Sequence, residues 1–179
     1  SESAMLAQYE ILERRFLFKR SVFPSKWGRG IGERFSLAGD YSGYPVSLYD
    51  HYVKNESGKI VWTSLSLEML FAGELEIILE PIDGEVSARF DWKEGLIAME
   101  SDLERFRLWS NVEEMGALLV DDLLRERLGD FSGKGSFRLS KGFFEYRESG
   151  RMLDEAARVR FQNALIILAG LGDRVAELE

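Results

Sequence analysis

YPVSLYDHYVKNESGKIVWTSLSLEM, residues 44–69, is the stretch that decides the fold class of this 179-residue chain. Apolar and polar residues alternate along both of its arms, and the turn-forming residues of KNESGKI separate them. Alternation with a period of two indicates a β-strand, and two such runs joined by a short polar turn indicate a β-hairpin. We therefore expect antiparallel strands over 44–54 and 59–69. The serines and threonine of the second arm predict that one face of the hairpin meets solvent or lies at a sheet margin.

Outward from this hairpin, the same alternation predicts more strands. They fall at residues 33–39, 73–81, 86–90, 95–99 and 105–109, and in a second hairpin within 134–148. Apolar residues at three- and four-residue spacing predict an N-terminal helix within 4–16, a middle helix from Ser110 or Asn111 to Gly129, and a long C-terminal helix over 152–178. Without βαβ alternation, these elements indicate an α+β fold, with a mainly antiparallel sheet of about six to eight strands packed by the three helices.

The length and composition predict a single domain over residues 1–179. Hydrophobic residues make up 45% of the chain and charged residues 30%, which is typical of a globular protein. Within it, residues 1–34 form a basic N-terminal helix and a glycine-rich corner, and residues 35–179 form the α+β body.

Cysteine is absent and histidine occurs once. The chain therefore has no disulfide, thiolate nucleophile or cysteine-ligated metal, and a zinc site is improbable because such sites commonly need several nitrogen or sulfur ligands. No calcium-binding loop motif is present either. We expect neither a metal nor a cofactor.

The segment WGRGIGERF, residues 27–35, has three glycines at alternate positions. A dinucleotide-binding loop has the spacing G-x-G-x-x-G before a helix, and a Walker A loop ends in G-K-[S/T]. Neither pattern is met, and a strand is expected where the helix should begin. We interpret the segment as a positively charged corner.

The N-terminal part of the chain is basic and the rest is acidic. Residues 1–34 carry seven Lys and Arg against four Asp and Glu, whereas the remainder carries sixteen against twenty-seven. This asymmetry favours contact with anionic lipid or with the protein's own acidic face, and disfavours nucleic acid. A solvated surface without a partner is the alternative. Arg14, Arg15, Lys19 and Arg20 are the candidate contact residues.

His51, the single histidine, follows Asp50 in the first arm of the hairpin. Adjacent residues of a strand point to opposite faces, so Asp50 should not orient His51 as a triad acid would. An exposed or edge-strand histidine is the favoured interpretation. An alternative function, a small anionic-ligand-binding or enzyme domain, would need Arg29, Arg34 and His51 together in a pocket between sheet and helices.

Phe143 and Phe144 are adjacent in the second hairpin, so they should point to opposite faces of the sheet. One of them then needs cover from a helix or from a partner. This pair is the second candidate interaction surface, and an unknown protein or a second copy of the chain is the partner it would suit.

The chain also resembles a group of uncharacterised bacterial proteins in which a G-x-Y-x-G-x-x-V hairpin, an F-D motif and a last apolar helix form a soluble domain, often beyond one or two membrane segments. The matching positions are Gly39, Tyr41, Gly43, Val46, Phe90 and Asp91. The resemblance implies no activity and no catalytic residues.

The longest apolar run, residues 164–172, is far shorter than the roughly 20 residues that span a bilayer. We expect a cytoplasmic protein, placed at the cytoplasmic face of the membrane if a segment precedes Ser1 in the full-length protein. The favoured function is a non-enzymatic interaction or scaffold domain, peripheral to a membrane surface through its basic N-terminal segment.

Overall fold

The structure is a computed structural model. It describes residues 2–24, 33–55, 58–69, 73–83, 93–114 and 119–178. Arg29 and most of the glycine-rich segment lie outside the described residues, as do Phe90 and Asp91, and for Arg34 only the backbone is described.

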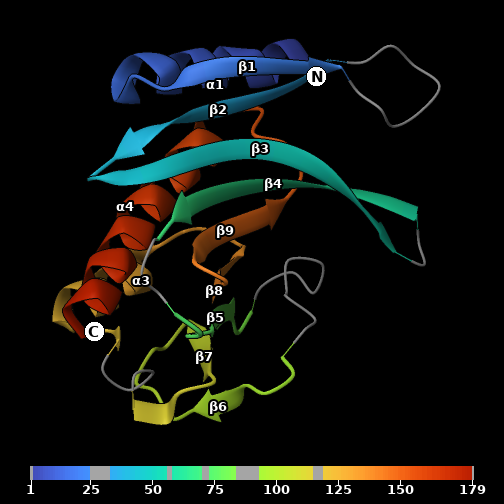
Figure 1. Cartoon of the computed structure of the whole chain (residues 1–179). Helices are drawn as coiled ribbons and strands as arrows, with labels where there is room; N and C mark the ends of the chain where they lie inside the picture. Colours follow the sequence, from blue (N-terminus) through green and yellow to red (C-terminus); the bar gives the residue numbers. More distant parts are fainter. Residues whose placement is uncertain are drawn as a thin grey trace.

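Nine strands of the described chain form one antiparallel sheet in the order β1-β2-β3-β4-β9-β8-β5-β7-β6 (Figure 1). The strands are β1 (Lys19–Pro24), β2 (Glu33–Tyr41), β3 (Tyr44–Asn55), β4 (Gly58–Glu68), β5 (Ile77–Pro81), β6 (Ile97–Met99), β7 (Phe106–Ser110), β8 (Ser136–Ser140) and β9 (Phe143–Ser149). The helices are α1 (Glu2–Phe16), α3 (Asp122–Asp130) and α4 (Glu155–Leu178). The α+β fold class, the antiparallel sheet and the long C-terminal helix are thus confirmed.

The hairpin that decides the fold forms as expected, with β3 and β4 paired so that Tyr49 lies opposite Ser64. The expectation that one face of its second arm is wet or at a sheet margin was wrong: Thr63, Ser64 and Ser66 are buried, because β4 also pairs with β9.

The described residues form nine strands rather than about six to eight. Strand β1 was not expected, and it forms inside the basic N-terminal segment, while the strand expected over 86–90 lies outside the described residues. Strand β1 pairs with β2 at the edge of the sheet, from Lys19 opposite Ala38 to Pro24 opposite Glu33. Its charged residues and terminal proline suit an edge strand, where they discourage pairing with another chain.

The expected middle helix is interrupted. Residues 113, 114 and 119 are helical and residues 115–118 lie outside the described ones, whereas residues 120 and 121 are not helical. Helix α3 begins at Asp122, and the side chain of Asp121 caps it by accepting a hydrogen bond of 2.9 Å from the backbone N–H of Leu124. The capping aspartate fixes the first residue of the helix, which hydrophobic periodicity alone does not reveal.

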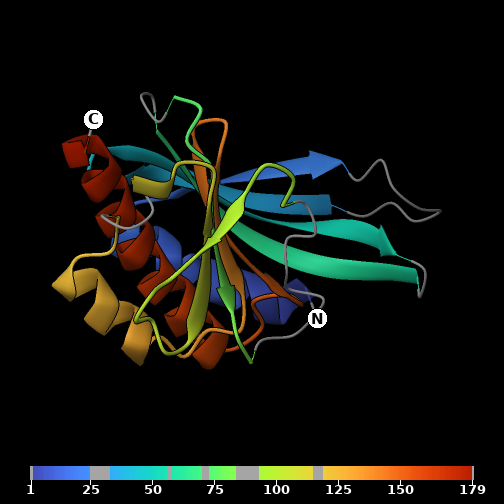
Figure 2. The same cartoon turned by 90° about the horizontal axis from the view of Figure 1, so that it is seen from below.

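The helices α1, α3 and α4 lie on the same side of the sheet (Figure 2). The core therefore forms between that side and the helices, and it includes Tyr9 of α1, Leu128 of α3, Leu168 of α4 and, from the sheet, Leu48 and Phe137. We call the opposite side the helix-free face; it carries every second residue of the strands, among them Tyr49, His51, Trp62, Ser64 and Arg147.

Two fully buried tyrosines, Tyr9 and Tyr146, make the stability of the fold depend on pH in the alkaline range. Burial raises the pKa of both, with the charge of Asp50 adding to the effect at Tyr9 and that of Glu148 at Tyr146. In the unfolded chain these phenols lose their protons near pH 10, whereas in the folded protein they keep them. The unfolded state therefore becomes favoured as the pH rises.

We expect the free energy of unfolding to be unaffected by these tyrosines below pH 10 and to fall above it, by up to about 1.4 kcal/mol per pH unit for each. Urea unfolding at pH 9 and pH 11 measures the loss. Tyr146→Phe should make the loss smaller, and an equal loss in that variant would contradict the assignment to Tyr146.

Candidate functional site

Residues 14–19 span the end of α1, the connection and the start of β1. We call Arg14, Arg15, Leu17 and Lys19 the N-terminal tip. Leu17 has a φ of 57° and a side chain that is 83% exposed. A positive φ is unusual for a bulky residue, and full exposure removes any packing benefit for the leucine. Its outward position therefore needs a cause in the neighbouring residues.

The cause is an aromatic cluster behind the tip. The rings of Phe16 and Phe18 stack with their centroids 5.4 Å apart, and Tyr41 packs edge-on against Phe16 at 5.8 Å. Gly39 makes room for this packing, because a Cβ at that position would lie 2.5 Å from the ring of Phe18. With both phenylalanines turned inward, Leu17 between them is held outward.

The cations of the N-terminal segment are arranged unequally. Arg14 is exposed and pairs with Glu10 at 2.6 Å, and Arg15 and Lys19 are also exposed. Arg20 instead is half-buried and pairs with Glu13 at 2.5 Å. Of the four predicted contact residues, the first three are thus exposed and lie within three positions of Leu17 along the chain. Arg20 joins β1 to α1 through Glu13.

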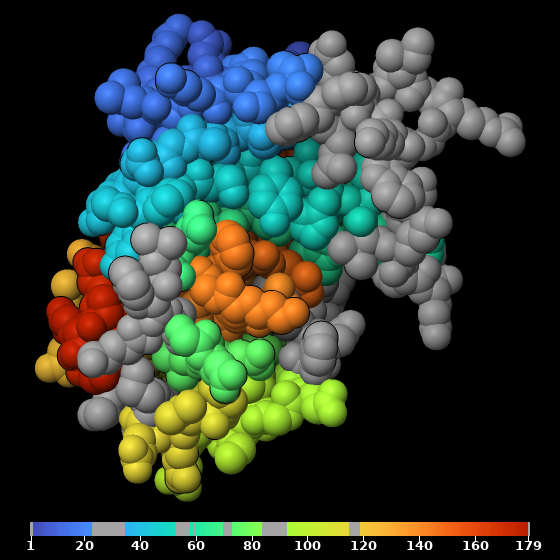
Figure 3. Space-filling model, in the orientation of Figure 1, coloured from blue at the N-terminus to red at the C-terminus, as the bar shows by residue number. Residues whose placement is uncertain are grey.

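The helix-free face carries the second concentration of polar and aromatic groups. Figure 3 looks onto this face, with β8 and β9 at its centre in orange. His51 Nε2 lies 2.9 Å from the hydroxyl of Ser64, and the rings of Tyr49 and His51 are 5.6 Å apart. The guanidinium carbon of Arg147 lies 4.5 Å from the centre of the Trp62 ring, a cation–π contact.

Tyr49, on the helix-free face, is influenced by three charged residues of the second hairpin. Burial raises the pKa of Tyr49, and the carboxylate of Glu145 raises it further. Arg138 and Arg147 act in the opposite direction and lower it. Two guanidinium groups and one carboxylate therefore act on the same phenol.

Asp50 and His51 point to opposite faces, as predicted. Asp50 is buried on the helix side and pairs with Arg151, with 3.1 Å between Oδ2 and Nε. His51 contacts Ser64, which is completely buried. Because Asp50 lies on the opposite face, this serine–histidine contact lacks the orienting acid of a catalytic triad. The contact was missed from sequence, although the pairing of β3 with β4 brings the two residues onto neighbouring strands.

The predicted anion site is not assembled from the described residues. Arg29 lies outside them, the side chain of Arg34 is not described, and His51 lies on the helix-free face rather than between sheet and helices.

The two adjacent phenylalanines of β9 point to opposite faces of the sheet, as predicted. Phe143 is 48% exposed on the helix-free face, whereas Phe144 is fully buried in the core.

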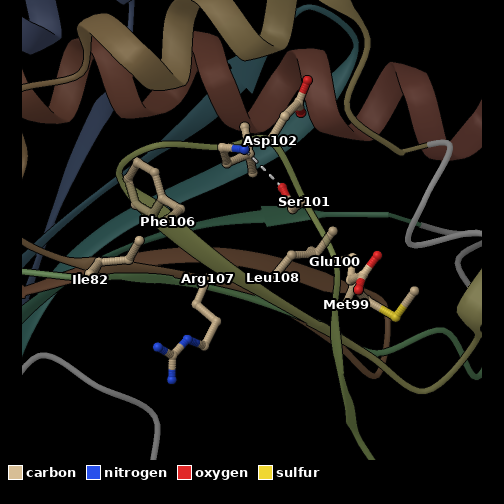
Figure 4. Close-up of a pocket in the computed structure, with 9 residues that line it drawn as sticks. Ile82, Met99, Glu100, Ser101, Asp102, Phe106, Arg107 and Leu108 are labelled. Carbon is tan, nitrogen blue, oxygen red and sulfur yellow. Dashed lines mark hydrogen bonds between the residues drawn. The ribbon is translucent and has the colours of Figure 1, made fainter.

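A pocket of about 680 Å³ lies where the chain leaves β6 (Figure 4). Strand β6 pairs only with Leu108 to Ser110 of β7, so Phe106 and Arg107 have no β6 partner. The walls of the pocket combine five apolar side chains with the polar side chains of Glu100, Ser101, Asp102 and Arg107. Ser101 Oγ accepts a 3.0 Å hydrogen bond from the N–H of Leu103. None of the predicted site residues lines this pocket.

Two features are absent from the described residues: a metal-binding cluster and a membrane-spanning helix. These residues contain no group of three or more His, Asp or Glu side chains placed to hold a metal ion. None of the described helices is both long and apolar enough to cross a bilayer.

The chain matches no protein-family model and no curated protein sequence. The resemblance through Gly39 and Tyr41 therefore stays a prediction. Among solved structures it is similar to the crystal structure of the mycobacterial trehalose monomycolate transport factor A, TtfA, with a TM-score of 0.67 and 9% sequence identity. The match covers 96% of this chain and 94% of that one. At such low identity the likeness shows the fold alone: the chain shares its architecture with this transport factor along nearly the whole length of both.

Proposed function

We propose that this protein is a non-enzymatic interaction domain that lies peripherally on an anionic membrane surface through its N-terminal tip. The observation that carries the proposal is Leu17, held in solvent by the packing of Phe16 and Phe18 and flanked along the chain by exposed basic residues. An exposed apolar side chain flanked by basic residues is the arrangement that inserts at the boundary of headgroups and acyl chains.

The expected attraction is weak and reversible. Each Lys or Arg near an anionic surface contributes about 1 kcal/mol, and burying a leucine side chain contributes roughly 2 kcal/mol. The ion pair between Arg14 and Glu10 reduces the electrostatic part. The protein carries a net charge of −8, so the same membrane repels most of the remaining surface and only the tip should face it.

The setting of such a domain is part of the proposal. The structurally similar protein is named a transport factor, and we propose by analogy that this domain has an accessory role in transport. The partner bound away from the membrane, whether a different protein or a second copy of this chain, would use the helix-free face, where Phe143 is half-exposed.

Co-sedimentation with lipid vesicles tests the membrane contact. We expect binding to vesicles that contain phosphatidylglycerol, weaker binding at high salt, and little binding to pure phosphatidylcholine. Leu17→Ser should weaken binding about tenfold or more, since it removes most of the apolar contribution.

The matched control is Leu123→Ser, at an exposed leucine of α3 that is 53% accessible and lies outside the tip. It should bind like the unaltered protein. Equal binding to neutral and anionic vesicles, or equal losses in Leu17→Ser and Leu123→Ser, would refute the proposal.

A further inference from the structure

Trp62 and Ser136 are among the buried side chains of the helix-free face whose polar atoms lack a hydrogen-bond partner in the part of the chain that the structure describes. Trp62 is 4% exposed and its Nε1 has no hydrogen-bond acceptor, while Ser136 is completely buried and its Oγ has no partner. Unpaired buried polar groups are uncommon in folded proteins and mark places where something else completes the hydrogen bonding.

Both groups lie beside Arg147. The Trp62 ring stacks on the guanidinium at 4.5 Å, and Ser136 of β8 is the direct cross-strand partner of Arg147 on β9. Arg138 lies two residues further along β8, opposite Glu145. An indole N–H and a guanidinium can only donate hydrogen bonds, and a hydroxyl can donate as well. The set therefore suits a ligand group that only accepts.

We propose that Trp62, Ser136 and Arg147 form a binding site for an oxyanion, the carboxylate or phosphate group of a small ligand. The charges agree with it, since Arg138 and Arg147 outnumber Glu145 at the centre of this face. All three residues change the pKa of Tyr49, Glu145 upward and the two arginines downward, so their charges lie close to the same part of the face.

This site is separate from the N-terminal tip, because it is built from β4, β8 and β9 rather than from α1 and β1. It differs from the anion site that the alternative function required: the arginines come from the second hairpin, and His51 lies on β3 opposite Trp62. Success or failure of ligand binding here is independent of membrane binding.

Nuclear magnetic resonance of the four tryptophan indoles tests the proposal in the full chain. Trp62→Phe identifies the Trp62 Nε1–H signal. Sodium phosphate and sodium acetate are then titrated separately at constant ionic strength. We expect one of them to shift the Trp62 signal downfield to saturation. The Trp109 Nε1 is also buried without an acceptor, but it lies on β7 away from Arg147, so its signal should stay in place. The responding salt tells phosphate from carboxylate recognition.

Two variants locate the site. Ser136→Ala should weaken binding about fivefold, equivalent to about 1 kcal/mol for one hydrogen bond. Arg147→Gln should weaken it at least about tenfold. Arg107→Gln, at an exposed arginine on the same face of β7, is the control and should bind normally. A Trp62 signal that no anion shifts, that sodium chloride shifts equally, or whose response is unchanged in Ser136→Ala would overturn the proposal.

Discussion

Replacing Glu148 by glutamine is expected to lower the free energy of unfolding by about 3 kcal/mol. Glu148 is buried on the helix side of β9 and accepts a forked pair of hydrogen bonds from Arg160 of α4, with 3.0 Å between Nη2 and Oε2 and 3.1 Å between Nε and Oε1. It also accepts a 3.0 Å hydrogen bond from the hydroxyl of Tyr146. This network joins the C-terminal helix to the centre of the sheet.

The size of the expected loss comes from the charge that remains. Glutamine keeps the shape of the side chain but removes the carboxylate that pairs with the largely buried guanidinium of Arg160. Removing one partner of a buried ion pair typically costs 3–5 kcal/mol, and the amide oxygen of glutamine still accepts one hydrogen bond, which places the loss at the lower end.

Urea unfolding at pH 7 measures the change, and a double variant separates its causes. Glu148→Gln combined with Arg160→Met should be more stable than Glu148→Gln alone, because the unpaired charge has gone. Glu10→Gln breaks the exposed ion pair with Arg14 and should cost less than about 0.5 kcal/mol. A similarly small cost for Glu148→Gln would mean that solvent reaches Arg160.

The sequence predicted the sheet well where alternation was long and uninterrupted. Both hairpins formed, and Phe143 and Phe144 took opposite faces, because the period of a strand fixes the side on which each residue lies. Strand β1 was missed since it is short and charged, and only its pairing with β2 makes it a strand. The cap at Asp121 shows the same limit for helices.

The candidate sites were less accessible to sequence reasoning because they depend on neighbours that are distant in the chain. The contact of Trp62 with Arg147 joins residues 85 positions apart, on strands whose adjacency is set by the β4–β9 pairing. The exposure of Leu17 follows from the packing of Phe18 against Gly39, which a helical pattern cannot reveal. The basic residues were found from composition, but their ion pairs were not.

Gly135→Ala is expected to destabilise the fold by more than about 4 kcal/mol, enough to unfold a protein of ordinary stability. A Cβ at position 135 would lie 1.9 Å from the carbonyl oxygen of Arg147 and 2.7 Å from its carbonyl carbon. Because these are backbone atoms of the neighbouring strand, they cannot turn aside as a side chain can. Strands β8 and β9 would have to separate, and the 3.1 Å hydrogen bond from the Gly135 N–H to Tyr146 would be lost.

The matched control is Gly129→Ala in the last turn of α3, where a Cβ would meet no atom within 4 Å. Alanine is favoured over glycine in a helix by up to about 1 kcal/mol, so this variant should equal or exceed the unaltered protein in stability. Thermal unfolding followed by circular dichroism compares the two. Because the same methyl group is added in both, a folded Gly135→Ala protein with an unchanged melting temperature would show that β8 and β9 are not held at this spacing. A large loss at position 135 alone would show that the pairing that carries Ser136 and Arg147 depends on the absence of a side chain at Gly135.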